Sequence, residues 1–141
     1  MGTIMHILPT LHHIVHLHDQ GLTVGGSEGL RDKGLLEGAL NSVETAQHYD
    51  DMDVPQTAYL LLQRLVKAHA FADGNKRTAA LAFELTLTLN GWTWTGSDKD
   101  LANLVIQTAA SDTITFNLKT LCSQNPVVQR LFNYDTGNWT P

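Results

Sequence analysis

The stretch "AYLLLQRLVKAHAFADGNKRTAALAFELTLTLNG", from Ala58 to Gly91, decides the fold. Two apolar runs flank a short polar centre, and each run is apolar over most of a helical circumference, which is typical of a buried helix. Pro55 suits the first turn of the first helix, and the glycine at the end of the stretch suits the end of the second. Because Asp, Gly and Asn are poor residues for a helix interior, we expect the first helix to end near Phe71 and the second to begin near Asn75.

Helical spacing continues upstream of this hairpin. Leu11, Ile14, Val15 and His18 recur at the spacing of one helix face. Thr10 precedes them and is a possible N-cap. We therefore expect a first amphipathic helix that ends at Gly21.

Two more helices and one short extended segment complete the expected elements. One helix follows Asp32, which can cap it, and another follows Ser97 or Asp98. The segment "WTWT", from Trp92 to Thr95, predicts a short strand or an extended turn. A short helix is expected around "NLKTLCSQ", and the tail "NYDTGNWTP" is expected to be frayed. The prediction is an all-α fold forming a single domain over residues 1–141, in which the tail from about residue 126 is not assigned.

Composition restricts the classes of function. The chain has 141 residues, a formal net charge of −5, 43% hydrophobic residues and 16% charged residues, which is typical of a globular protein. No block of Lys or Arg is present, so no direct nucleic-acid binding is expected, because such binding requires a basic face. No run reaches the ~20 apolar residues of a membrane helix, and no secretory signal is visible. A single cysteine, Cys122, cannot form an internal disulfide, which suits a reducing compartment. Together these features predict a cytoplasmic protein without a membrane partner.

The polar centre of the hairpin, "HAFADGNKR" from His69 to Arg77, predicts an anion site. The first turn of a helix carries N–H groups without internal partners and the positive end of the helix dipole, so it favours phosphate. Gly74 would let a phosphate approach the backbone, and Asn75 offers an amide donor. Lys76 and its neighbour Arg77 add two positive charges to the same turn.

Two further residues of this segment suit the chemistry of a Mg-nucleotide. Asp73 offers the hard oxygen ligand that Mg²⁺ takes together with phosphate oxygens of the substrate. His69 can act as a general base near neutral pH. The sequence has neither a Walker A loop nor the glycine loop of protein kinases. These residues therefore predict phosphoryl or nucleotidyl transfer from a Mg-nucleotide to a hydroxyl, in a fold that differs from those of P-loop enzymes and protein kinases.

The segment resembles the signature of the Fic/Doc superfamily, and specifically that of its Doc (death on curing) branch. Fic enzymes read His-Pro-Phe, two residues and then Gly-Asn-Gly-Arg, whereas Doc proteins read His-x-Phe-x-Asp-Gly/Ala-Asn-Lys-Arg. Lys76 stands where Fic has its second glycine, which favours the Doc branch. The likeness extends over roughly residues 10 to 110, through "LHDQGLTVGG" and "GSEGLRDKGLLEGAL" as well as the hairpin.

The resemblance implies a Fic/Doc-type helical bundle whose central buried hairpin carries the motif loop. It implies that His69 is the catalytic residue that takes the proton from the target hydroxyl, and that Asp73 helps to hold Mg²⁺. Phe71 matches the hydrophobic anchor that packs the loop onto the core. The residues that match the nest for the ATP phosphates are Gly74, Asn75, Lys76 and Arg77.

The Doc relatives imply the function of a toxin in a toxin–antitoxin pair. Such a toxin binds ATP in an orientation inverted relative to Fic, phosphorylates a threonine of elongation factor Tu and stops translation. The chain would then be an ATP-dependent Ser/Thr phosphotransferase, controlled by a Phd-type antitoxin that wraps a disordered tail onto it. The segment "KGLLEG", Lys33–Gly38, lacks the Ser or Thr that begins the inhibitory helix motif of Fic proteins, so inhibition in trans is expected.

Several alternatives stay open at this point. The enzyme could transfer AMP, which is the usual Fic reaction, or the fold could serve as a non-catalytic Doc-like module for partner binding, although the intact motif disfavours that role. Arg77 could form an inter-helix salt bridge, and Lys67 could reach a phosphate or remain solvated. His12 and His16 have the i, i+4 spacing of metal ligands but no matching carboxylate or cysteine, so a histidine-rich surface is the preferred interpretation.

Overall fold

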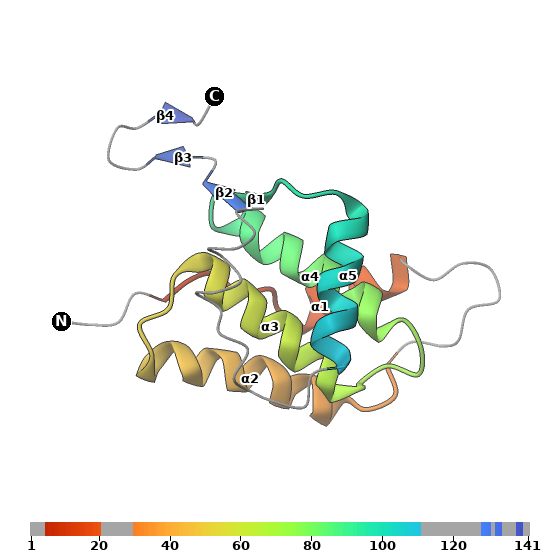
Figure 1. Ribbon diagram of the computed structural model, residues 1–141. Helices are drawn as coiled ribbons and strands as arrows, with labels where there is room; N and C mark the ends of the chain where they lie inside the picture. Colours follow the sequence, from red (N-terminus) through yellow and green to blue (C-terminus); the bar gives the residue numbers. More distant parts are fainter. Residues whose placement is uncertain (1–4, 21–29, 111–127, 131, 134–137, 140–141) are drawn as a thin grey trace.

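The computed structural model describes residues 5–20, 30–110, 128–130, 132–133 and 138–139. Helices dominate these residues and form one bundle, which confirms the predicted all-α fold (Figure 1). None of the helices within the described ranges has the length and apolar character that a membrane span requires. In chain order the elements are α1 (Leu11–Gln20), α2 (Lys33–Tyr49), α3 (Val54–Ala68), α4 (Asn75–Leu89), β1 (Trp92–Trp94), α5 (Asp98–Ala110), β2 (Val128–Arg130), β3 (Phe132–Asn133) and β4 (Asn138–Trp139).

Helix α3 lies at the centre of the bundle. Ten of its fifteen residues are buried, and it packs against α2, α4 and α5 (Figure 1). Helix α4 returns beside it and contacts α1, β1 and α5 on its other sides. Leu61 and Leu62 of α3 and Leu87 of α4 are completely buried. The central buried hairpin predicted from the two apolar runs is thus confirmed, and α3 is the more deeply buried of its two helices.

Side-chain caps begin the helices where the sequence predicted them. The Asp32 carboxylate accepts a hydrogen bond from the backbone N–H of Leu35 at 3.1 Å at the start of α2. At the start of α5, the Ser97 hydroxyl accepts from the N–H of Asp100, whose carboxylate accepts from the N–H of Ser97, both at 3.1 Å. Thr10 accepts from the N–H of residue 13 at the start of α1. These bonds satisfy first-turn donors that have no partner inside the helix.

Helix α3 ends at Ala68, earlier than the predicted end near Phe71. His69 adopts the left-handed conformation, with φ 50° and ψ 43°, and this stops the helix. The following carbonyl, that of Ala70, accepts hydrogen bonds from the backbone N–H groups of residues 31 and 32 at 2.9 and 3.0 Å. Pairing with a distant segment therefore replaces the last helical turn, and the helical pattern alone could not reveal this. The predicted start of α4 at Asn75 is confirmed.

Short strand pairs occupy the region after α4. Strand β1 pairs antiparallel with β2, with Trp92 opposite Arg130, so the strand interpretation of "WTWT" is confirmed. Strand β3 pairs with β4, with Phe132 opposite Trp139. The prediction of a frayed tail is wrong for the paired residues, because backbone hydrogen bonds between strands hold them in register. The predicted helix around "NLKTLCSQ", which includes Cys122, lies outside the described residues.

Candidate active site at the turn between α3 and α4

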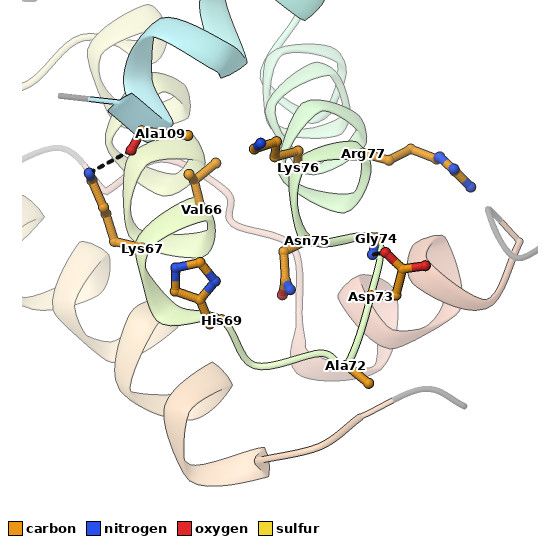
Figure 2. A pocket seen from close by; sticks show the side chains of 10 residues that line it. All are labelled: Val66, Lys67, His69, Ala72, Asp73, Gly74, Asn75, Lys76, Arg77 and Ala109. Carbon is orange, nitrogen blue, oxygen red and sulfur yellow. Dashed lines mark hydrogen bonds between the residues drawn. The ribbon is translucent and has the colours of Figure 1, made fainter. Parts of the chain in front are cut away.

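A pocket of about 480 Å³ lies at the turn between α3 and α4 (Figure 2). Its walls come from the end of α3, the motif loop, the first turn of α4 and the end of α5. All of the predicted site residues line this single pocket: His69, Asp73, Gly74, Asn75, Lys76 and Arg77. The structure therefore brings together the residues that the sequence selected.

The charges on the pocket wall are mostly positive. The lining contains three cationic side chains, Lys67, Lys76 and Arg77, and one carboxylate, that of Asp73. The whole chain, by contrast, carries a formal net charge of −5. A local excess of positive charge in an acidic protein attracts anions to that place.

His69 enters the pocket from the end of α3 with a strained backbone. Within the described residues it is the one non-glycine residue with a positive φ, a conformation that costs about 1–2 kcal/mol for an L-residue. The Arg31 guanidinium donates from Nη2 to the His69 carbonyl oxygen at 2.6 Å and helps to hold this geometry. The imidazole itself is exposed. Strain of this kind is found where surrounding contacts fix a functional side chain.

Asn75 closes the motif loop on itself. Its Nδ2 donates to the Phe71 carbonyl oxygen at 2.8 Å, and its Oδ1 accepts from the Phe71 N–H at 3.0 Å. The side-chain amide that the sequence offered to a phosphate therefore makes a two-point contact within the loop. What Asn75 can give a phosphate directly is its first-turn backbone N–H.

The start of α4 has no side-chain cap. Its N-cap residue is Gly74, with φ 77° and ψ 17°, and glycine has no side chain to accept from the first-turn N–H groups. The Gly74 N–H donates to Oδ1 of Asp73 at 2.8 Å, and the Gly74 carbonyl accepts from the Thr78 N–H at 3.0 Å. The helix thus begins with uncapped donors and the positive end of its dipole, both of which favour an anion.

Asp73 fits the role of a single magnesium ligand. Its carboxylate is exposed, and one oxygen accepts from Gly74, which leaves acceptor capacity on both oxygens. No three His, Cys, Asp or Glu side chains of the described ranges gather into a metal-binding group. Mg²⁺ is commonly held by one or two carboxylates together with waters and substrate phosphates. The donor set at Asp73 is consistent with that pattern.

The cationic side chains divide between two sides of the pocket (Figure 2). Lys76 extends toward the side where Val66 and Ala109 lie, whereas Arg77 extends to the opposite side of α4, where Asp73 also lies. Lys67 is exposed, and its Nζ donates to the Ala109 carbonyl oxygen at 3.0 Å. Lys67 therefore joins α3 to the end of α5, a contact that the sequence did not predict.

Comparison with known proteins supports the family that the motif indicates. A model of the Fic/DOC family matches residues 8–87, which is more than half of the chain. The chain belongs to the Fic/DOC family. It is 29% identical over 109 residues to the "Protein kinase doc" of Escherichia phage P1, a match that covers 76% of this chain and 84% of the relative. Together with Lys76 in the Doc pattern, this likeness supports the Doc branch of the family.

Two residues of this Fic/DOC chain contact the motif loop but were not selected from the sequence. His18 of α1 is 2% exposed, stacks on Phe71 and contacts the backbone of Asp73. Its position on the apolar face of α1 was a signal, because a buried histidine must find a hydrogen-bond partner. Arg31 gave no comparable signal, since its partner is a backbone carbonyl of the distant His69.

The remaining histidines of α1 agree with the preferred interpretation. His12 and His16 are exposed, as a histidine-rich surface requires. Phe71 is 3% exposed, which confirms its predicted role as the anchor of the loop.

Proposed function

We propose that this chain is the toxin of a toxin–antitoxin pair and transfers the γ-phosphate of ATP to a Ser or Thr hydroxyl of a protein target. The observation that carries the proposal is the position of Lys76. It stands at the uncapped start of α4 and extends over the side of the pocket on which His69 lies (Figure 2). The likeness to a relative named protein kinase doc supports phosphate as the transferred group. A threonine of elongation factor Tu is the proposed target.

Phosphate binding in this proposal rests on the start of α4. The first-turn N–H groups and the helix dipole bind the phosphate chain, and Gly74 permits its close approach to the backbone. Lys76 occupies the place where Fic enzymes have glycine, so its side chain competes with a deeply placed α-phosphate. Its ammonium group then pairs with the terminal phosphate, which is left nearest to His69. Arg77 supplies charge from the other side of the helix.

His69 acts as the general base in the transfer step. Its imidazole takes the proton of the target hydroxyl as that oxygen attacks the γ-phosphorus in line. The bond from the γ-phosphorus to the bridging oxygen breaks, and ADP leaves with the electron pair. Magnesium held at Asp73 would neutralise charge on the phosphate oxygens. The exposed position of His69 leaves room for a protein substrate to approach it.

The same pocket motivates an antitoxin as the partner. An exposed catalytic histidine and an open phosphate site require control, and no inhibitory helix motif was recognised in the sequence. A Phd-type antitoxin with a disordered tail could cover this surface by folding on binding. Growth arrest on expression of this chain alone, relieved by coexpression of the antitoxin, is the expected result. Harmless high-level expression of the intact motif would contradict the toxin proposal.

Intact-mass analysis of purified elongation factor Tu tests the transfer itself. After incubation with this protein and Mg-ATP, the factor should gain the mass of one phosphate. His69→Ala should lower the rate by about 10²–10⁴ while Mg-ATP binding persists, because only the base is removed. His16→Ala, on the exposed face of α1, is the matched control and should keep the full rate.

Two outcomes of that experiment would overturn the proposal in different ways. A gain of one AMP would show attack at the α-phosphorus with pyrophosphate as the leaving group, and Fic-type AMP transfer would replace phosphate transfer. No gain under conditions where Mg-ATP binds would exclude this target. If Mg-ATP also failed to bind, a non-catalytic module for partner binding would be favoured.

A further inference from the structure

We infer that His18 is a positioning residue that fixes the motif loop from behind and thereby sets the geometry of Asp73 and Gly74. The inference rests on the proposed function in one respect, since it assigns these two residues to Mg-nucleotide binding. His18 comes from α1, far from the motif in sequence, and no feature of the motif itself points to it. Two contacts with the loop, and the position of the ring beside Gly74, carry the inference.

The first contact is a hydrogen bond to the loop backbone. Nε2 of His18 lies 2.7 Å from the carbonyl oxygen of Asp73. A carbonyl oxygen can only accept, so Nε2 carries the hydrogen and donates it. The residue is 2% exposed, and a buried donor that loses its partner is costly. The bond therefore restricts rotation of the peptide that joins Asp73 to Gly74.

The second contact is a ring stack. The imidazole lies parallel to the Phe71 ring, with centroids 3.9 Å apart and an angle of 8° between the planes. Phe71 is itself 3% exposed and anchors the beginning of the loop. The stack fixes the plane of the imidazole, and this plane in turn directs Nε2 at the Asp73 carbonyl.

The third observation concerns the space beside Gly74, the N-cap of α4. A Cβ atom added to Gly74 would lie 3.5 Å from both Nε2 and Cδ2 of His18, so the ring fills the space beside this residue. His18 thus contacts the loop at residues 71 and 73 and lies next to the start of the phosphate-binding helix. The other ring nitrogen, Nδ1, lies 3.5 Å from the Asp19 carboxylate, which is at the surface.

These contacts place His18 behind a proposed magnesium ligand. The Asp73 peptide determines where its carboxylate lies and where the Gly74 N–H points, and that N–H donates to the same carboxylate. Without the bond from Nε2, the peptide can rotate and the carboxylate loses its fixed direction. Residues that orient metal ligands through hydrogen bonds typically contribute about 10–100-fold to metal affinity or activity.

Two substitutions separate the hydrogen bond from the ring. His18→Phe keeps the aromatic ring and the stack on Phe71 but removes the N–H donor. His18→Gln removes the ring but places an amide N–H near the position of Nε2. His16→Phe, on the exposed face of the same helix, is the matched control.

Amide hydrogen exchange of the loop is the first readout and needs no nucleotide. In His18→Phe, the amide of Gly74 should exchange roughly three- to tenfold faster than in the wild type, because one hydrogen bond of the loop is lost. His18→Gln should restore most of the protection, and His16→Phe should match the wild type. Equal protection of Gly74 in the wild type and His18→Phe would overturn the inference.

Calorimetric titration with Mg-ATP is the second readout. His18→Phe should weaken binding by about 10–100-fold, and His18→Gln should recover most of it. Faster exchange with unchanged affinity would show a structural residue without a positioning role and would also overturn the inference. A wild type that does not bind Mg-ATP would defeat the proposed function, yet the exchange experiment would still decide whether His18 fixes the loop.

Discussion

The two helices of the central hairpin begin in opposite ways. At the start of α3, the Asp53 carboxylate accepts from the Gln56 N–H at 2.8 Å, and the Gln56 side chain accepts from the Asp53 N–H at 3.0 Å. This capping box satisfies two donors at once. At the start of α4, Gly74 offers no side-chain cap at all. The capping box stabilises the start of α3. The start of α4 keeps backbone N–H donors that an external anion can bind.

Charge sharpens the difference. The positive end of a helix dipole favours acidic side chains in the first turn. Neither helix has an acidic residue in its first turn, but α3 has the Asp53 carboxylate at its N-cap, whereas the first turn of α4 carries Lys76 and Arg77. The start of α4 therefore departs from two rules that stabilise helices, and such departures are expected at functional sites. What stabilises this end of the helix, in our account, is the phosphate chain of ATP.

Among the substitutions that test this comparison, Lys76→Ala should have the largest effect. Loss of its charged contact should weaken Mg-ATP binding by about 1.5–3 kcal/mol, which is roughly a tenfold to hundredfold change in affinity. The free energy of unfolding without nucleotide should rise by about 0.3–1 kcal/mol, because a cation leaves the positive end of the helix. Calorimetry and urea denaturation measure the two quantities.

Lys99→Ala is the matched control, since Lys99 is an exposed lysine in the first turn of α5. It should raise the free energy of unfolding by a similar amount and leave Mg-ATP affinity unchanged. If Lys76→Ala bound Mg-ATP as tightly as the wild type, the contrast between the two helix starts would have no bearing on function.

A smaller effect is expected at the start of α3. Asp53→Ala removes one half of the capping box and should lower the free energy of unfolding by about 1 kcal/mol. The rate of phosphate transfer should not change, because Asp53 lies at the end of α3 opposite to the motif loop. Asp51→Ala, at an exposed position just before it, should leave both quantities unchanged. A large loss of transfer in Asp53→Ala would show that the two ends of α3 are coupled.

The smallest effect concerns the middle of α4. Burial raises the pKa of Glu84, and the nearby Asp98 carboxylate raises it further. The folded state therefore binds this proton more tightly than the unfolded chain. The stabilisation from this proton is fully present when the pH is below the pKa of Glu84 in the unfolded chain. It is lost as the pH rises through the pKa of Glu84 in the folded protein. Glu84→Gln should thus be modestly more stable than the wild type at pH 7, and the gap should close below about pH 4.

Denaturation curves across this pH range test that expectation. Glu44→Gln, on the exposed face of α2, should show no such gap. Mg-ATP affinity should be the same in Glu84→Gln and in the wild type. A gap that widens toward low pH would contradict the sign of the pKa shift.

Local patterns predicted most of the fold and nearly all of the candidate site. Apolar periodicity predicted the hairpin, and the residue types at Asp32 and Ser97 predicted the helix starts that the structure shows. The motif predicted that His69 and residues 73–77 would act together, and these six residues line one pocket. These predictions were correct because each feature depends on interactions among a few neighbouring residues.

Local patterns could not predict contacts between segments that are distant in the sequence. Helix α3 was expected to continue because nothing near Phe71 shows that residues 31 and 32 hydrogen-bond to Ala70. The pairing of Phe132 with Trp139 was missed for a related reason, since a short strand pair leaves little periodicity. The role of His18 depends on a bond that joins residues 55 positions apart.

The most direct test of the central claim is an NMR titration of the backbone amides with Mg-ATP. The two helix starts serve as site and control within one molecule. We predict saturable shifts at the amides of Asn75, Lys76 and Arg77, and unchanged amides at Gln56 and Thr57 in the capped first turn of α3. Saturable binding that leaves the first turn of α4 unshifted would contradict the claim that this uncapped helix start holds the phosphates.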